Sequence, residues 1–302
     1  MQNSDEDFDE YPISYSIDNA ILMHRDAHFG GDFAIMLDYY KKEGKGVNKE
    51  FEISRIEELN EMEKTTGKNL SPLLLSGVEA EKVSHSKSLY KDLRELFEKT
   101  EAKSKIPRLI ADLILADDDK EISEAIQRAI AEKGNIVQAL IDLVRSEDFY
   151  DPLFPGYGQA PLRAAECLGL IGDKRAIISL FESIGTGDFF NEDMILNALH
   201  AIGEPSKAFL LKVVHGHPIT MDNEQAAVAL VKFKEDPEVS TACLNMLKEI
   251  DLKKYMPLAT YLVLACEGLP SHLQKELLSL MERPSTPKSI SLDIKEVAKS
   301  WK

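Results

Sequence analysis

Apolar side chains recur at three- and four-residue spacing over most of the chain, as they do in helices that bury one face. The pattern is clearest in residues 161–184, where two apolar stripes are separated by a glycine-aspartate turn. The apolar positions are Ala164, Ala165, Leu168 and Ile171 in the first stripe, and Ala176, Ile177, Leu180, Phe181 and Ile184 in the second. The sequence therefore predicts a pair of amphipathic helices joined by a short turn.

This helical pair recurs along the C-terminal half of the chain. Ile171-Gly172 reappears as Ile202-Gly203, 31 residues later, and the same offset leads to a third copy around Ala226-Ala227. A looser fourth copy covers residues 259–281. A single pair cannot bury its apolar faces alone, so neighbouring copies are expected to stack into a helical solenoid.

Glycine, aspartate and proline mark the turns between these helices. Glycine suits the left-handed residue that ends a helix, aspartate can cap the next helix, and proline fits a first helical turn. The expected positions are Gly172, Gly203 and Gly268 for the left-handed ends, Asp173 for the cap, and Pro205, Pro237 and Pro270 for the first turns.

The first copy also resembles a known repeat. LRAAECLGLIGDKRAIISL is similar to the HEAT-like repeats of the phycobilisome lyase type, with the pattern RxxAAxALGxIGDxRAxxxL. The matching residues are Ala164, Ala165, Leu168, Gly169, Ile171, Gly172, Asp173, Arg175, Ala176 and Leu180, and Arg163 stands two positions later than the arginine of the pattern. The second copy keeps Ala198, Leu199, Ile202 and Gly203, and the resemblance covers residues 160–281. It implies an all-α, alpha-alpha superhelix that binds partners more often than it catalyses reactions.

Helical periodicity persists upstream without a recognisable repeat, so the N-terminal half is expected to be helical but irregular. Helices are expected near residues 18–43, 50–64 and 78–99. The predicted organisation is as follows: residues 1–17 form a mobile acidic arm, 18–148 an irregular helical region, 149–161 a loop rich in proline and aromatic residues, 162–283 the repeats, and 284–302 a capping helix.

The loop FYDPLFPGYGQAP interrupts the repeat pattern with four aromatic residues and three prolines. Stiff loops that carry aromatics lose little entropy on binding, so Tyr150, Phe154 and Tyr157 are candidate contacts for a partner. The alternative is a structural plug, in which the phenylalanines are buried and the tyrosine hydroxyls bond to the backbone. The sequence leaves both interpretations open.

The favoured function is a non-enzymatic scaffold or adaptor that binds a protein or peptide along the concave face of the solenoid. The second helices of the repeats are expected to form that face. The candidate contacts chosen from repeat position are Lys174, Arg175, Ser206, Lys207 and Lys212.

Composition and charge narrow the partners. The chain has 44% hydrophobic and 29% charged residues, as folded proteins do, and a net charge of −16. Such acidity argues against nucleic acids and anionic membranes as partners. Three widely spaced cysteines in apolar surroundings indicate core residues in a reducing compartment, so a cytoplasmic location is expected.

Two alternatives to a scaffold remain. His24 and His28 are four residues apart in MHRDAHFGGD, so on a helix they share one face and form a candidate metal site. HGH at residues 215–217, near Asp222 and Glu224, is a weaker candidate. The second alternative, an assembly enzyme of the phycobilin lyase kind, follows from the repeat resemblance. No catalytic signature and no cofactor motif stand out.

Overall fold

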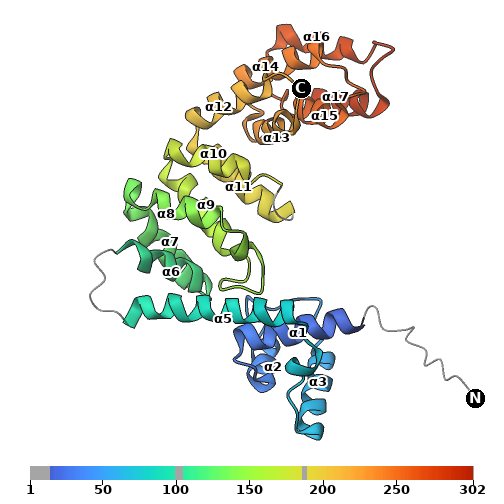
Figure 1. Ribbon diagram of the computed structural model, residues 1–302. Helices are drawn as coiled ribbons and strands as arrows, with labels where there is room; N and C mark the ends of the chain where they lie inside the picture. Colours follow the sequence, from blue (N-terminus) through green and yellow to red (C-terminus); the bar gives the residue numbers. More distant parts are fainter. Residues whose placement is uncertain (1–13, 99–104, 186–188, 302) are drawn as a thin grey trace, which may run out of the picture. The chain divides into compact units, whose positions relative to one another are not determined.

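The computed structural model describes residues 14–98, 105–185 and 189–301, and within these ranges all regular structure is helical (Figure 1). The predicted all-α, superhelical class is confirmed. No helix in the described part of the chain is long and apolar enough to cross a membrane.

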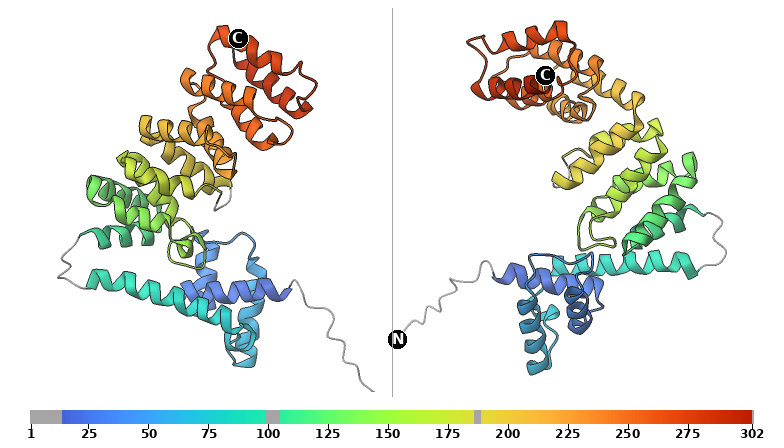
Figure 2. Two further views of the ribbon diagram at one scale, coloured as in Figure 1. Left: turned by 45° about the horizontal axis from the view of Figure 1, so that its top comes forward. Right: turned by 180° about the vertical axis from the view of Figure 1, so that it is seen from behind.

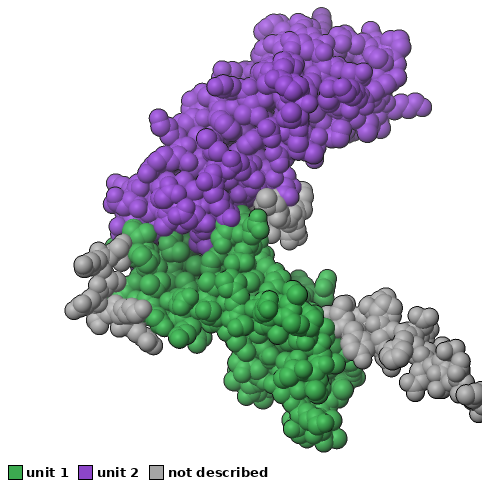
Figure 3. All heavy atoms as spheres, in the orientation of Figure 1, with its two compact units in different colours: residues 1–127, 146–160 green, residues 128–145, 161–302 purple. Residues whose placement is uncertain are grey.

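The helices form two compact units, coloured separately in Figure 3. Unit 1 consists of residues 1–127 and 146–160, and unit 2 of residues 128–145 and 161–302. The predicted boundary at residue 148 differs from this division, because residues 128–145 pack with the repeats. The proline-rich loop belongs instead to unit 1.

Unit 1 is built around a long helix, α5, and a shorter helix packed against it, α1. Its helices are α1 (Ser14–His28), α2 (Phe33–Lys41), α3 (Ile53–Thr66), α4 (Ser71–Leu74), α5 (Gly77–Glu98), α6 (Ile106–Leu115) and most of α7 (Asp119–Ala131), followed by the 3-10 turn η2 (Glu147–Tyr150). One core cluster joins α1, α2 and α3 through Ile21, Leu22, Phe33, Met36 and Ile56, which are all at most 3% exposed.

The structure refines two expectations for unit 1. Helix α1 begins at Ser14, so the last residues of the predicted acidic arm are helical, and residues 1–13 of that arm lie outside the described residues. The helical stretch expected over residues 18–43 is divided into α1 and α2 at Gly30-Gly31, where both glycines have positive φ. Asp32 then caps α2 by accepting from the backbone N–H groups of Ala34 and Ile35.

Unit 2 is a stack of helix pairs in two layers (Figure 2). The first layer holds α9 (Ala160–Ile171), α11 (Phe189–Ile202), α13 (Met221–Leu230), α15 (Met256–Leu264) and α17 (Lys288–Ser300). The second layer holds α8 (Val137–Val144), α10 (Ile177–Glu182), α12 (Glu204–Val214), α14 (Pro237–Glu249) and α16 (Ser271–Leu280). The 3-10 turns η1 (Lys133–Asn135), η3 (Lys174–Ala176) and η4 (Val231–Phe233) complete the unit.

Small residues set the close approach of first-layer helices. A Cβ atom on Gly169 of α9 would lie 2.9 Å from the Cα of Ala198 in α11, which is too close for any side chain. Ala164, Ala165, Ala226 and Ala227 are fully buried in the same layer. The repeated small residues are therefore explained by the packing of helix on helix.

The turns follow the predicted chemistry at most positions. Gly172 and Gly203 have φ of 70° and 79°, and Asp173 caps η3 by accepting from the N–H of Arg175. Gly268 does not have a positive φ. It is glycine for another reason, because a Cβ there would lie 2.4 Å from the carbonyl oxygen of Glu235. Pro270 precedes α16 as its N-cap and does not occupy the first turn.

Candidate functional site

The two histidines proposed as metal ligands lie side by side on α1 in unit 1. Their ring centroids are 4.5 Å apart. Burial lowers the pKa of His24 to about 3, and the neighbouring His28 adds to that shift. Burial also lowers the pKa of His28 to about 4. Both rings are therefore neutral at pH 7.

The hydrogen bonds of His28 leave it no lone pair for a metal ion. Its Nε2 lies 2.9 Å from the carbonyl oxygen of Pro152, which can only accept, so Nε2 carries the proton. Its Nδ1 therefore accepts from the hydroxyl of Tyr90 at 2.7 Å. Among the described residues, no three histidine, cysteine or acidic side chains gather closely enough to hold a metal ion. The described residues therefore give no support to a metal site at His24 and His28, or at His215 and His217, and the metal-site hypothesis stays a prediction.

The proline-rich loop packs into unit 1 through its backbone and its apolar side chains. The Ser86 hydroxyl of α5 donates to the carbonyl of Leu153 at 2.7 Å, and Lys82 pairs with Asp151 at 2.5 Å. Phe154 is 2% exposed and packs with Ala27 and Leu153. The prediction that Phe154 contacts a partner is therefore wrong, because its ring is buried inside its own unit. Its burial agrees with the plug interpretation.

Tyr157 is the most constrained residue of the loop. Its φ of 54° lies in the left-handed region, which costs a non-glycine residue about 1 kcal/mol or more. The ring reaches between α1 and α2, with its centroid 4.5 Å from that of His28 and 6.4 Å from that of Tyr39. Burial raises the pKa of the Tyr157 hydroxyl, and the neighbouring Tyr90 and Tyr39 add to that shift. Tyr157 is only half-buried, as is Tyr150, so their role as partner contacts stays a prediction.

Two glycines between α2 and α3 make room for this aromatic cluster. A Cβ atom on Gly46 would lie 2.2 Å from the Tyr157 ring, and one on Gly44 would lie 2.2 Å from the Tyr39 ring. The sequence presents this GKG stretch only as a separator between helices. Its packing role becomes visible once the loop, more than 100 residues away, lies against it.

We expect Gly46→Ala to lower the free energy of unfolding by about 1–3 kcal/mol, as overpacking of a well-filled core does. Gly46 has no positive φ, so the backbone tolerates alanine and only the Tyr157 ring obstructs it. The matched control is Gly77→Ala, where a new Cβ meets no atom within 4 Å. Urea unfolding compares the two variants, and an equal effect of both would contradict the packing argument.

Arg25 of α1 carries a fully buried charge that was not predicted from the sequence. Its guanidinium donates to Asp26 at 2.8 Å, to Glu63 at 2.7 Å and to Ser71 at 2.8 Å. It also lies 4.3 Å above the centroid of the Phe33 ring. These bonds join α1, α3 and α4 through one side chain. In the sequence, the only sign of this buried charge is that an arginine stands at a position of α1 where the helical pattern calls for an apolar residue.

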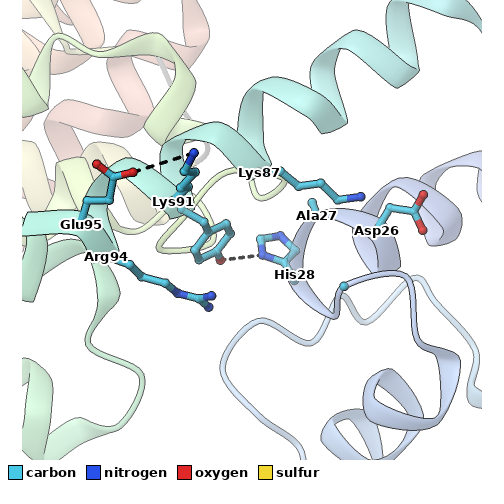
Figure 4. Close-up of a pocket in the computed structure, with 9 residues that line it drawn as sticks. Asp26, Ala27, His28, Lys87, Lys91, Arg94 and Glu95 are labelled. Atoms are coloured by element: carbon cyan, nitrogen blue, oxygen red, sulfur yellow. Dashed lines mark hydrogen bonds and ion pairs between the residues drawn. The ribbon is translucent and has the colours of Figure 1, made fainter. Parts of the chain in front are cut away.

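Beside His28, unit 1 contains a cavity of about 440 Å³, shown in Figure 4. Three cationic residues of α5, Lys87, Lys91 and Arg94, line it together with Tyr90. The end of α1 and the following turn form the opposite wall, through Asp26, Ala27, His28 and Gly30.

In unit 2, two of the five residues proposed as partner contacts are not accessible to a partner. Ser206 is fully buried. The Lys207 ammonium lies 2.8–2.9 Å from carboxylate oxygens of Glu204, Asp236 and Glu238, and its side chain is 9% exposed. Ser206 packs inside the fold, and Lys207 joins α12 to α14, so neither side chain is open to a partner.

The other three residues, Lys174, Arg175 and Lys212, are exposed, and their role in binding stays a prediction. Arg175 also has a structural role, because its guanidinium donates to the carbonyl of Gly134 at 2.8 Å and to Asp173 at 2.7 Å. These bonds connect the turn η3 to the turn that precedes α8.

A groove of about 450 Å³ lies on the opposite, first layer of unit 2. It crosses α11, α13, η4 and α15, which belong to three successive repeats. Its apolar lining consists of Leu196, Val228, Val231, Tyr261 and Leu264. The binding surface was expected on the second helices of the repeats, so the repeat pattern did not predict this groove.

Comparisons with protein-family models, with curated proteins and with solved structures found no match to this chain. The resemblance to HEAT-like repeats therefore stays a hypothesis that rests on the motif in residues 161–184 and its copies.

Proposed function

We propose that the chain is a non-enzymatic helical-repeat scaffold of the HEAT-like kind, which binds a segment of a protein partner in the groove across α11, α13 and α15. The single observation that carries this proposal is the groove itself. Its apolar lining comes from three successive repeats, so an occupant would contact helices of three neighbouring repeats along the stack. Ligand sites commonly have this volume and a mostly apolar lining.

The charges around the groove favour an apolar occupant. Lys232 pairs with Asp193 at 2.6 Å, and Lys234 pairs with Glu267 at 2.5 Å. Because both lysines already have acidic partners, the rim offers little net charge to an ionic ligand. The occupant that fits best is an aliphatic or aromatic side chain, anchored from a partner segment that runs across the repeats.

A photo-crosslinking amino acid at one groove position tests the proposal. Tyr261 replaced by p-benzoylphenylalanine retains an aromatic ring at the groove, whereas the same replacement at the exposed Lys212 of α12 probes the second layer. We expect irradiation in native lysate to give a discrete adduct from position 261 and none from position 212. Mass spectrometry should map the crosslink to an apolar side chain of the partner.

A second substitution makes the result specific. Val228→Asp, introduced beside the crosslinker, places a charge in the groove and should abolish the adduct while the melting temperature stays near that of the parent. An adduct from position 212 alone would show that the partner binds the second helices and not the groove. No adduct from either position, or an adduct insensitive to Val228→Asp, would refute binding in the groove.

A further inference from the structure

The cavity in unit 1 concentrates positive charge in a chain that is otherwise acidic. Acidic residues outnumber Lys and Arg by 52 to 36, yet Lys87, Lys91 and Arg94 follow one another at four- and three-residue spacing on one face of α5. Like charges at this spacing repel each other and destabilise the helix slightly. Negative charge close to the three side chains would offset this repulsion.

The carboxylates of the cavity do not supply all of that compensation. Asp26 is already bonded to the buried guanidinium of Arg25 at 2.7–2.8 Å. Glu95 lies 3.9 Å from the ammonium of Lys91, as Figure 4 shows. Within the described ranges, neither Lys87 nor Arg94 has a carboxylate at ion-pair distance. Lys87 and Arg94 thus line the cavity with donor groups from which a bound anion could accept hydrogen bonds.

Aromatic and neutral groups form the wall between these two cations. The Arg94 guanidinium carbon lies 5.7 Å from the centroid of the Tyr90 ring. The Tyr90 hydroxyl is engaged with His28, and burial raises the pKa of Tyr90, so this wall carries no negative charge at neutral pH. A partly enclosed site with limited access to water strengthens the attraction between cations and a bound anion.

The positions of Lys87 and Arg94 suit an anion with more than one charged group. Seven residues separate them, which corresponds to about 10 Å along an α-helix. A planar guanidinium binds phosphate oxygens in pairs, and Lys87 adds a single charged donor on the Asp26 side of the cavity (Figure 4). A volume of about 440 Å³ also accommodates a small organic or inorganic phosphate.

We propose that this cavity binds a small phosphate-bearing anion, with Arg94 and Lys87 donating to its oxygens and the Tyr90 ring forming the adjacent wall. Lys91, whose ammonium lies 3.9 Å from the carboxylate of Glu95, is a further lining residue. This site lies in unit 1 and is independent of the protein-binding groove proposed for unit 2.

Isothermal titration of the full chain with inorganic pyrophosphate tests the site. We expect binding that weakens as salt is raised, and at least a tenfold loss of affinity in Arg94→Gln and in Lys87→Gln. Both side chains are exposed, so the variants should keep the wild-type melting temperature. Lys64→Gln is the matched control, because it removes an equal charge from α3, outside the cavity.

The control should bind within twofold of the wild type. Absence of pyrophosphate binding by the wild type at millimolar concentration would overturn the proposal. So would an equal loss in Lys64→Gln and Arg94→Gln, since the attraction would then come from general surface charge.

Discussion

Replacing Arg25 with methionine is expected to destabilise unit 1 by about 3–5 kcal/mol, the effect of removing one partner from a buried ionic network. Methionine fills much of the same volume but cannot donate to Asp26, Glu63 or Ser71. Asp26 is 8% exposed, so its carboxylate would lose its main compensating charge in a site with little access to water. The contact of the guanidinium with the Phe33 ring would also be lost.

Hydrogen–deuterium exchange resolved by peptide can measure this effect, because the two units can be followed separately. Protection should fall in α1, α3 and α4 and stay unchanged in α13–α15. Arg25→Lys keeps the charge but loses the forked donor geometry, so we expect it to recover only part of the protection. The control Lys42→Met removes an exposed ion pair with Asp38 and should cost less than about 1 kcal/mol. An Arg25→Met protein with wild-type protection would show that the network contributes specificity without stability.

Unit 1 is also expected to lose stability in mild acid through its two buried histidines. Their pKa values fall from 6.5 to about 3 for His24 and about 4 for His28, so the unfolded chain binds more protons than the folded one below pH 6.5. Stability is therefore fully present above pH 6.5 and is lost as the pH falls toward 4. Each histidine costs about 1.4 kcal/mol per pH unit in this window, or on the order of 5 kcal/mol for both at pH 4.5.

Urea unfolding between pH 7.5 and 4.5, followed by near-ultraviolet circular dichroism of the tyrosines, measures this loss. His24→Phe keeps the edge contacts with Phe29, Tyr40 and Phe51 but cannot be protonated. Its decrease in stability should be about 2–3 kcal/mol smaller than that of the wild type. His85→Gln replaces an exposed histidine of α5 and should behave as the wild type does. An equal decrease in His24→Phe and wild type would assign the acid sensitivity to the carboxylates instead.

The candidate sites were only partly predictable from the sequence. Spacing placed His24 and His28 together on one helical face, and the structure confirms that they are neighbours. Spacing could not show that Pro152 and Tyr90 occupy both nitrogens of His28, because these partners are 124 and 62 residues away. The same limit applies to Lys207, whose partners Asp236 and Glu238 come from the next repeat.

By itself, the sequence determined the helical class, the stacked pairs of unit 2 and most of their turns. These features follow from local rules, since the apolar period, the glycine ends and the aspartate caps act within a few residues of one another. Only the tertiary structure decided where the proline-rich loop packs, that Phe154 is buried, that Gly46 accommodates Tyr157, and which layer carries the groove. The physical reason is that burial and hydrogen bonding depend on residues that the chain brings together from distant positions, which periodicity along one helix does not encode.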